Sequence, residues 1–313
     1  AVRCGAGDYY DSGSFWIGRK MIRNDISWND YLGIKRMNPS TLVCGRKSML
    51  HLKQAIDGGT HEDTQPLSFG RGFHSVTLKQ GTHIVIPPFH LDAENRLKNG
   101  ELPKSPKATG YYKDAVAKFR EENRGYDILT QEEFEEIQAM SAAVWSKPLA
   151  RKILETCGEN KEVTLEGEIC GVPFKGRVDI LCPSIIADLK TCNSIENRAF
   201  GGDCVKYGYN FKMALYQELV RQNSCHRQCV YIAVEKSAPY DVCVRPIPDD
   251  LLAVKLRQAK KILERYKICL ESGVWPGVDQ GNDDELLYVP EYEYDEEPDW
   301  SPVDETEEVE QYF

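Results

Sequence analysis

The chain has 313 residues, 41% of them hydrophobic, which is enough for a globular protein with a core of its own. No window approaches the ~20 consecutive apolar residues of a membrane-spanning helix, so we expect no integral membrane protein. The net charge of −10 is uneven: 15 Asp and Glu and no Lys or Arg follow residue 277, which leaves 39 basic against 34 acidic residues and a net of +5 in 1–277. A mildly basic body with an acidic end is compatible with a protein that handles nucleic acid.

The eleven cysteines are scattered along the chain. Cys225 and Cys229 form the closest pair, and no second close pair completes a set of zinc ligands. We therefore expect reduced thiols.

The first half of the chain is expected to be mainly helical after residue 37, and we assign no fold to residues 1–37. Asn38-Pro39-Ser40-Thr41 predicts a helix over 42–56 with Ser40 or Thr41 as its N-cap. Helical spacing recurs over 67–78 and 113–123, with a short extended run at 84–86 between them. Thr130 and Glu133 form a capping box, which predicts a helix from 131 to about 156.

The pattern changes to strands after residue 160. Two runs, 163–169 and 172–181, flank Cys170-Gly171 and predict a hairpin, and 185–189 is a short apolar strand. A helix over 205–221, strands over 229–235 and 242–245, and a helix over 250–270 follow. This order predicts one α/β domain over 38–277 with a mixed central sheet flanked by helices.

The acidic segment 278–313 is expected to be a disordered tail. Three interpretations stay open for it: it covers a basic DNA path, it recruits a partner, or it only keeps the protein in solution.

The candidate chemistry lies in the predicted strands. Asp179 stands on the second strand of the hairpin, and Asp188 and Lys190 stand two residues apart on the next strand, so their side chains share one face. Two carboxylates can hold Mg²⁺, and an ammonium group can orient water or stabilise developing negative charge. This is the chemistry of phosphodiester cleavage.

These residues and four further segments resemble the PD-(D/E)xK nucleases, and more narrowly the RecE-type (exonuclease VIII-like) phage exonucleases. The resemblance covers about residues 38–277. Its further segments are Ser68-Phe69-Gly70-Arg71-Gly72-Phe73-His74, the Tyr-rich stretch 209–216, the hairpin 232–242, and Trp275-Pro276-Gly277. It implies the PD-(D/E)xK core fold and Mg²⁺ as cofactor, with Mn²⁺ as a substitute.

The resemblance also implies roles for single residues. His74 would be a metal ligand or active-site acid, Asp179 and Asp188 the metal carboxylates, Lys190 the catalytic lysine, and Glu162 a further acidic residue of the site. Expected DNA-binding residues are Arg177, Thr191, Tyr209, Lys212 and Tyr216. Lys212 replaces the family's usual Gln, which leaves the role of that position open. Arg177 would either steer a phosphate or pair with Asp188, and the tyrosines would either bind DNA or pack the helix on the sheet.

The resemblance implies a 5′→3′ exonuclease that acts on linear double-stranded DNA ends and leaves single-stranded 3′ tails for recombination. It also implies a homo-oligomeric ring, a single-strand annealing protein as partner, and the cytoplasm of a bacterial or phage-infected cell. Two alternatives stay open: a structure-specific endonuclease with the same core, and a non-catalytic DNA-binding or annealing protein. We expect no iron–sulfur cluster, because Cys225, Cys229, Cys243 and Cys269 lack the spacing of the cluster-bearing branch.

Overall fold

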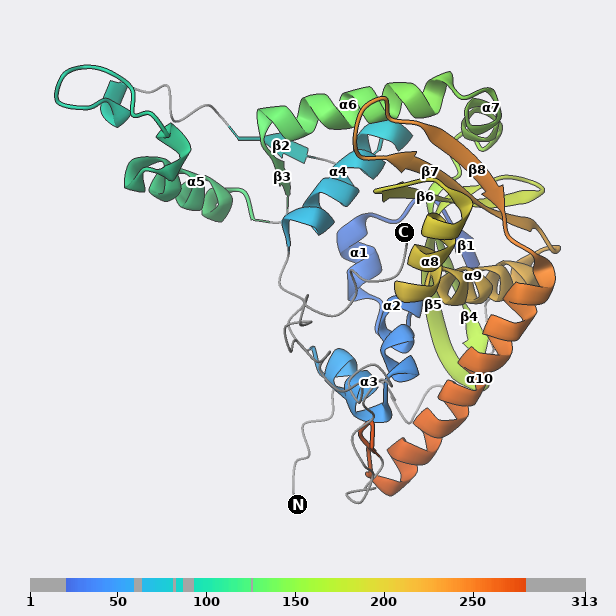
Figure 1. Ribbon diagram of the computed structural model, residues 1–313. Coiled ribbons are helices and arrows are strands. Elements are labelled where there is room, and N and C mark those ends of the chain that lie inside the picture. The colour runs from blue at the N-terminus through green and yellow to red at the C-terminus, as the bar shows by residue number, and fades with distance from the viewer. Residues whose placement is uncertain (1–20, 59–63, 81–82, 87–92, 125, 280–313) are drawn as a thin grey trace, which may run out of the picture.

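A six-stranded mixed sheet forms the centre of the protein (Figure 1). The computed structural model describes residues 21–58, 64–80, 83–86, 93–124 and 126–279. The strands in sheet order are β1 (Met21–Arg23), β4 (Lys161–Ile169), β5 (Val172–Leu181), β6 (Ile185–Cys192), β7 (Gln228–Glu235) and β8 (Val242–Pro246). β6 and β7 run parallel, and the other neighbours run antiparallel. The predicted mixed α/β sheet is confirmed. The tail prediction falls on 278–313, of which all but Val278 and Asp279 lies outside the described residues.

The hairpin between β4 and β5 turns at the predicted position. Cys170 and Gly171 have φ values of 52° and 76°, the left-handed pair that a two-residue hairpin turn needs to match the twist of its strands. β1 adds to the outer edge of β4, with Ile22 opposite Leu165. The sheet therefore begins before residue 38, in the segment to which the sequence pattern assigned no fold.

Helices cover both faces of the sheet. They are α1 (Trp28–Gly33), α2 (Pro39–Leu42), α3 (Met49–Ile56), α4 (Gln65–Leu78), α5 (Gly110–Glu122), α6 (Gln131–Ser146), α7 (Pro148–Thr156), α8 (Asn197–Lys206), α9 (Tyr209–Asn223) and α10 (Asp249–Ser272). Short 3-10 turns are η1 (Val43–Arg46), η3 (Ala93–Asn95) and η4 (Pro106–Ala108). A small parallel pair, β2 (His83–Val85) with β3 (Asp127–Leu129), lies beside α4.

Two hydrophobic cores result, one on each face of the sheet. The first core joins the sheet to α2, α3, α8, α9 and α10, and includes Phe174 and Phe211. The second core joins the sheet to α4, α6 and α7, and includes Phe73 and Ile180. Alternation along β6 sends successive side chains to opposite cores, so Ile186 lies in the first core and Ala187 in the second.

Three expected long helices are each divided in two. The helix expected over 42–56 stops after η1, and Ser48 starts α3 by accepting the N–H of His51. Its N-cap is Asn38, not Ser40 or Thr41, because the Asn38 side chain accepts the N–H of Thr41. A proline is tolerated in the first turn of a helix but removes a hydrogen bond from the interior, so Pro148 ends α6 and begins α7.

The third division falls at Gly208, whose φ of 68° ends α8 and begins α9. The capping box of Thr130 and Glu133 is present at the start of α6 as predicted.

Residues 93–124 form an arm that extends from the body beyond β2 and β3 (Figure 1). Its helix, α5, has no buried residue. Among the helices of the described residues, none combines the length and the hydrophobicity that crossing a lipid bilayer requires.

Candidate active site

The site lies where β5 and β6 separate. Their backbone ladder contains only the pairs Ile180–Ala187 and Leu181–Ile186. Beyond these pairs the Asp179 side chain replaces the backbone of β5 as hydrogen-bond partner of β6. Its Oδ2 accepts the N–H of Leu189 at 2.7 Å. We call this separation the fork.

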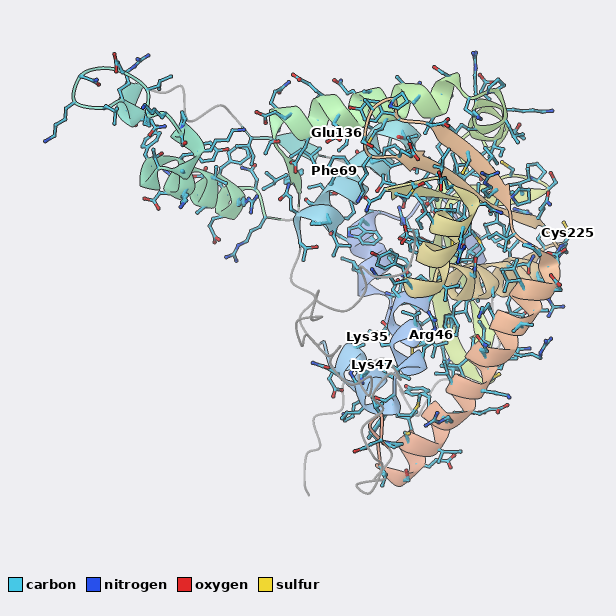
Figure 2. The ribbon with its side chains drawn as sticks, viewed as in Figure 1. Lys35, Arg46, Lys47, Phe69, Glu136 and Cys225 are labelled. Carbon is cyan, nitrogen blue, oxygen red and sulfur yellow. The ribbon has the colours of Figure 1, made fainter. Side chains whose placement is uncertain are left out.

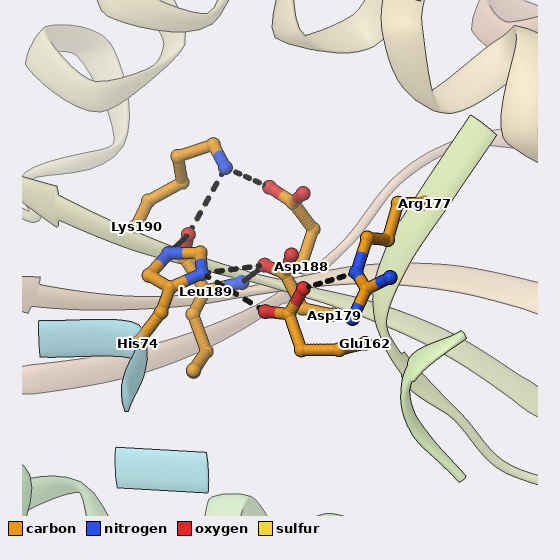
Figure 3. A network of polar contacts seen from close by, with 7 residues as sticks. All are labelled: His74, Glu162, Arg177, Asp179, Asp188, Leu189 and Lys190. Atoms are coloured by element: carbon orange, nitrogen blue, oxygen red, sulfur yellow. Dashed lines mark hydrogen bonds and ion pairs between the residues drawn. The ribbon is translucent and has the colours of Figure 1, made fainter. Parts of the chain in front are cut away.

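The fork brings together side chains from both faces of the sheet (Figure 3). His74 comes from α4 on the second-core face, and its Nε2 lies 3.1 Å from the carbonyl oxygen of Leu189. Lys190 shares the first-core face of β6 with Asp188, and its Nζ donates to the same carbonyl at 3.0 Å. The backbone groups of Leu189 that the fork leaves unpaired are thus satisfied by the side chains of Asp179, His74 and Lys190, as buried polar groups require.

His74, Glu162 and Asp179 form a possible metal centre. His74 Nδ1 is 3.6 Å from Asp179 Oδ2 and 3.9 Å from Glu162 Oε1. One potential ligand atom from each residue lies within 4.8 Å of the other two. Carboxylate oxygens suit Mg²⁺, and an added imidazole nitrogen suits Mn²⁺. The donor set therefore fits the divalent cation expected from the sequence.

Glu162 reaches this centre through a distortion of β4. Its φ is 50°, and Lys161 and Val163 on either side keep their register with β5. A non-glycine residue in the left-handed region costs about 1–3 kcal/mol, and such residues concentrate at functional sites. Arg177 holds the redirected carboxylate, with its Nε 2.9 Å from Glu162 Oε2.

Asp188 stands beside the metal centre and pairs with Lys190. The ring centroid of Tyr209, at the start of α9, lies 5.0 Å from the Lys190 ammonium nitrogen. Asp188 is not among the residues that form the compact trio. Its role as a metal ligand therefore stays a prediction, while its contact with the lysine is observed.

Burial and charge shift the acid–base behaviour of the site. Burial alone would lower the pKa of His74, but the carboxylates of Asp179 and Glu162 outweigh it and raise this pKa to about 9. Burial raises the pKa of Asp179 to about 7. Burial also opposes the charge on Lys190, yet Asp188 and Asp179 raise its pKa above the usual value. The lysine is consequently a permanent cation near neutral pH.

The expected DNA-binding residues have different surroundings. Arg177 pairs with Glu162 rather than with Asp188, and it also donates to the backbone oxygen of Ile26 at 3.1 Å. Tyr216 packs against Gly176, where an added Cβ would lie 3.0 Å from its ring. This position favours a packing role for Tyr216.

The remaining three candidates are half-buried, and Tyr209 among them contacts Lys190. Lys212 on α9 is half-buried, and burial together with the neighbouring Lys190 lowers its pKa. Thr191 is half-buried on β6, opposite Val234 of β7. Binding of DNA by any of these residues stays a prediction.

Sequence reasoning missed the residues of α1 that support the site. The guanidinium of Arg177 lies 5.7 Å from the ring centroid of Trp28 and 5.8 Å from that of Tyr31. These rings stack on each other with centroids 5.4 Å apart. Two aromatic residues three positions apart share one side of a helix, which is the only signal that could have found them.

This arrangement, two strand carboxylates and an Asp-x-Lys pair at the fork of a mixed sheet, is that of the PD-(D/E)xK class. Residues 33–282 match the family described as a PDDEXK-like domain of unknown function (DUF3799), and the chain belongs to this family. The fold is similar to that of a crystal structure from Eubacterium rectale described as a "putative exonuclease". That similarity has a TM-score of 0.51 and 14% sequence identity, and covers 85% of this chain and 95% of the other. No curated protein matches the chain.

Proposed function

We propose that this protein is a divalent-metal-dependent exonuclease that hydrolyses linear double-stranded DNA from its ends in the 5′→3′ direction. The observation that carries the proposal is the trio of His74, Glu162 and Asp179 directly beside the Asp188–Lys190 pair. Mg²⁺ or Mn²⁺ held by the trio would supply Lewis acidity to the scissile phosphate.

The protein's own residues divide the remaining work. Lys190 keeps its proton near neutral pH, so it serves to stabilise negative charge on the phosphate rather than to act as a base. Asp188 and the Leu189 carbonyl fix the position of that ammonium group. Arg177 holds Glu162 toward the metal centre.

The choice of substrate has separate support. The sequence resembles RecE-type exonucleases, and the Eubacterium rectale protein of similar fold carries the description of an exonuclease. The polarity, the ring-like assembly and a single-strand annealing partner rest on the sequence resemblance alone, and we propose them on that basis.

The test compares linear and covalently closed circular duplex DNA, with the 5′ or the 3′ ends labelled. We expect Mg²⁺-dependent release of label from the 5′ ends of linear DNA, with no cleavage of the circle and no activity in EDTA. Cleavage of the circle would instead establish an endonuclease. Binding of DNA without cleavage would establish a non-catalytic protein.

A pair of glutamate variants on β4 links the activity to the site. Glu162→Gln removes one trio carboxylate and should weaken Mn²⁺ binding at least ~tenfold, the scale set by losing even an indirect metal contact. Glu168→Gln makes the same change at an exposed position of the same strand, and should bind Mn²⁺ and cut DNA like the unmodified protein. Equal behaviour of the two variants would contradict the site.

A further inference from the structure

A shallow basic hollow lies beside the active site, between η1 and the junction of α8 with α9. It has a volume of about 370 Å³ and is lined by Val43, Arg46, Lys47, Lys206 and Tyr207. Three of these five side chains are cations and none is acidic. Arg46 and Lys47 are labelled in Figure 2 on the N-terminal helical segment, whose neighbouring residues Leu42 and Met49 belong to the first core.

Local packing holds the two sides of the hollow together. Gly208 leaves room for η1, because a Cβ at this position would lie 2.6 Å from both Arg46 Nη1 and a methyl group of Val43. The Arg46 guanidinium also donates to the backbone oxygen of Val205 at 3.2 Å. The α8–α9 junction is thereby fixed against η1, which places Tyr207 next to the cations.

A row of rings connects the hollow to the catalytic lysine. The ring of Tyr209 lies below Lys190, with 5.0 Å between the ring centroid and Nζ. Tyr207 stacks on Tyr209, with centroids 5.6 Å apart and an interplanar angle of 26°. Tyr207 is 48% exposed although it is a large ring. The hollow is therefore connected to Lys190 through two successive rings, those of Tyr207 and Tyr209.

We propose that this hollow binds one unpaired nucleotide of the DNA. This nucleotide is a neighbour of the nucleotide whose phosphate is cleaved. Its base stacks on Tyr207, and its phosphate is held by Arg46, Lys47 and Lys206. Aromatic rings beside cations are how proteins hold single strands, because every base has a flat face and every nucleotide a negative charge. This proposal rests on the proposed function, since it assumes that the substrate is DNA.

The position of Lys206 fits such a ligand. Its Nζ lies 5.1 Å from the ring centroid of Tyr207, and its side chain is exposed. An arriving base takes the place of this ammonium group on the ring. The displaced ammonium group stays within the hollow and can pair with the phosphate of the same nucleotide.

The test measures single-strand binding in EDTA, where cleavage cannot interfere. The probe is a short oligodeoxythymidylate that carries one 2-aminopurine, whose fluorescence falls when the base stacks. Tyr207→Ala should lower the affinity about tenfold, as expected for the loss of one base stack, and should abolish the fall in fluorescence. Tyr207→Phe keeps the ring and should retain both.

Charge variants test the phosphate contacts. Lys47→Glu and Lys206→Glu should each weaken binding. Each should also reduce the slope of log affinity against log salt concentration by about the amount that one phosphate contact contributes. Lys152→Glu makes the same change at an exposed position of α7, on the second-core face of the sheet, and should bind the probe normally.

The outcomes separate this proposal from the proposed function. If the unmodified protein cuts linear duplex DNA but Tyr207→Ala binds and quenches the probe normally, the hollow has no such role and the nuclease assignment stands. If binding depends on Tyr207 but Mg²⁺ supports no cleavage, the hollow stands and the nuclease assignment fails.

Discussion

The side chains of Lys190 and His74 both contact the backbone oxygen of Leu189. The contribution of Lys190 to catalysis can nevertheless be measured by itself. Lys190→Ala removes the cation expected to stabilise the transition state, so turnover should fall at least ~100-fold. Affinity for DNA should change little, because one phosphate contact is a small part of the total. Single-turnover rates and DNA binding in EDTA measure the two quantities.

A parallel fall of both quantities would contradict this assignment and make Lys190 a docking residue. Circular dichroism provides the control for folding, because the substitution leaves Asp188 without its cation.

His74 and Asp179 make metal binding depend on pH. Their pKa values of about 9 and about 7 mean that both groups hold protons at pH 6. Because the metal must displace these protons, its apparent affinity should rise steeply up to pH 7, less steeply up to pH 9, and then level off. Calorimetric titration with Mn²⁺ in buffers of different ionisation enthalpy counts the released protons.

The control for this prediction is His74→Gln, which removes the imidazole proton that competes with the metal between pH 7 and pH 9. Its affinity should be lower and Mn²⁺ should release one proton fewer, while the remaining pH dependence, that of Asp179, should move upward because the imidazolium that lowers the Asp179 pKa is gone. An affinity of the unmodified protein that is independent of pH between 6 and 9 would show that the trio does not bind the metal.

At the scale of elements, the approach of α9 to the sheet depends on Gly176. A Cβ at this position would lie 3.0 Å from two ring atoms of Tyr216 and 3.3 Å from Leu219. Gly176→Ala should lower the free energy of unfolding by about 1–3 kcal/mol, the range for overpacking a well-packed core. Denaturant titration measures this change.

Gly201 provides a matched comparison for Gly176. It lies within α8, and a Cβ there meets no heavy atom within 4 Å. Gly201→Ala should leave the stability unchanged or raise it by up to ~1 kcal/mol, because alanine favours a helix more than glycine does. A loss of stability in both variants would show that packing at Gly176 is not the cause.

The elements of the second half could be predicted because each has a local signal. Alternating or continuous apolar residues mark β4 to β8, and Gly171 marks the hairpin turn. The division of the helices at Ser48 and Gly208 could not be predicted in the same way. Ser48 acts as a local N-cap whose signal lies inside a continuous helical pattern, and the break at Gly208 depends on the approach of this glycine to Arg46 and Val43.

The candidate site was predictable to a similar extent. Asp188 and Lys190 share a face through the two-residue period of a strand, so their pairing follows from the sequence. The fork and the left-handed conformation of Glu162 do not, since both arise from the way in which β4, β5 and β6 meet. Without the resemblance, Glu162 would have been taken for an ordinary strand-end residue.

At the scale of the whole molecule, the arm of residues 93–124 should be dispensable for folding. The arm contacts the body through exposed side chains such as Lys107 with Glu132 and Arg120 with Gln65, and its helix α5 buries no residue. Exposed pairs of this kind contribute about 0–1 kcal/mol. Replacing the arm with a short Gly-Ser linker should shift Tm by no more than ~4 °C.

Thermal unfolding followed by circular dichroism measures this shift. A broad, non-cooperative transition in the shortened protein would show instead that the body needs the arm.

The fork has a consequence for observing this protein in solution. The amide hydrogen of Leu189 is held by the Asp179 carboxylate and not by a neighbouring strand. Its rate of exchange with deuterated water therefore reports on a single side chain of the metal centre, while the amides of Ile186 and Ala187 nearby report on the sheet. Nuclear magnetic resonance can thus follow metal binding at the centre through one backbone signal, without a substrate and without turnover.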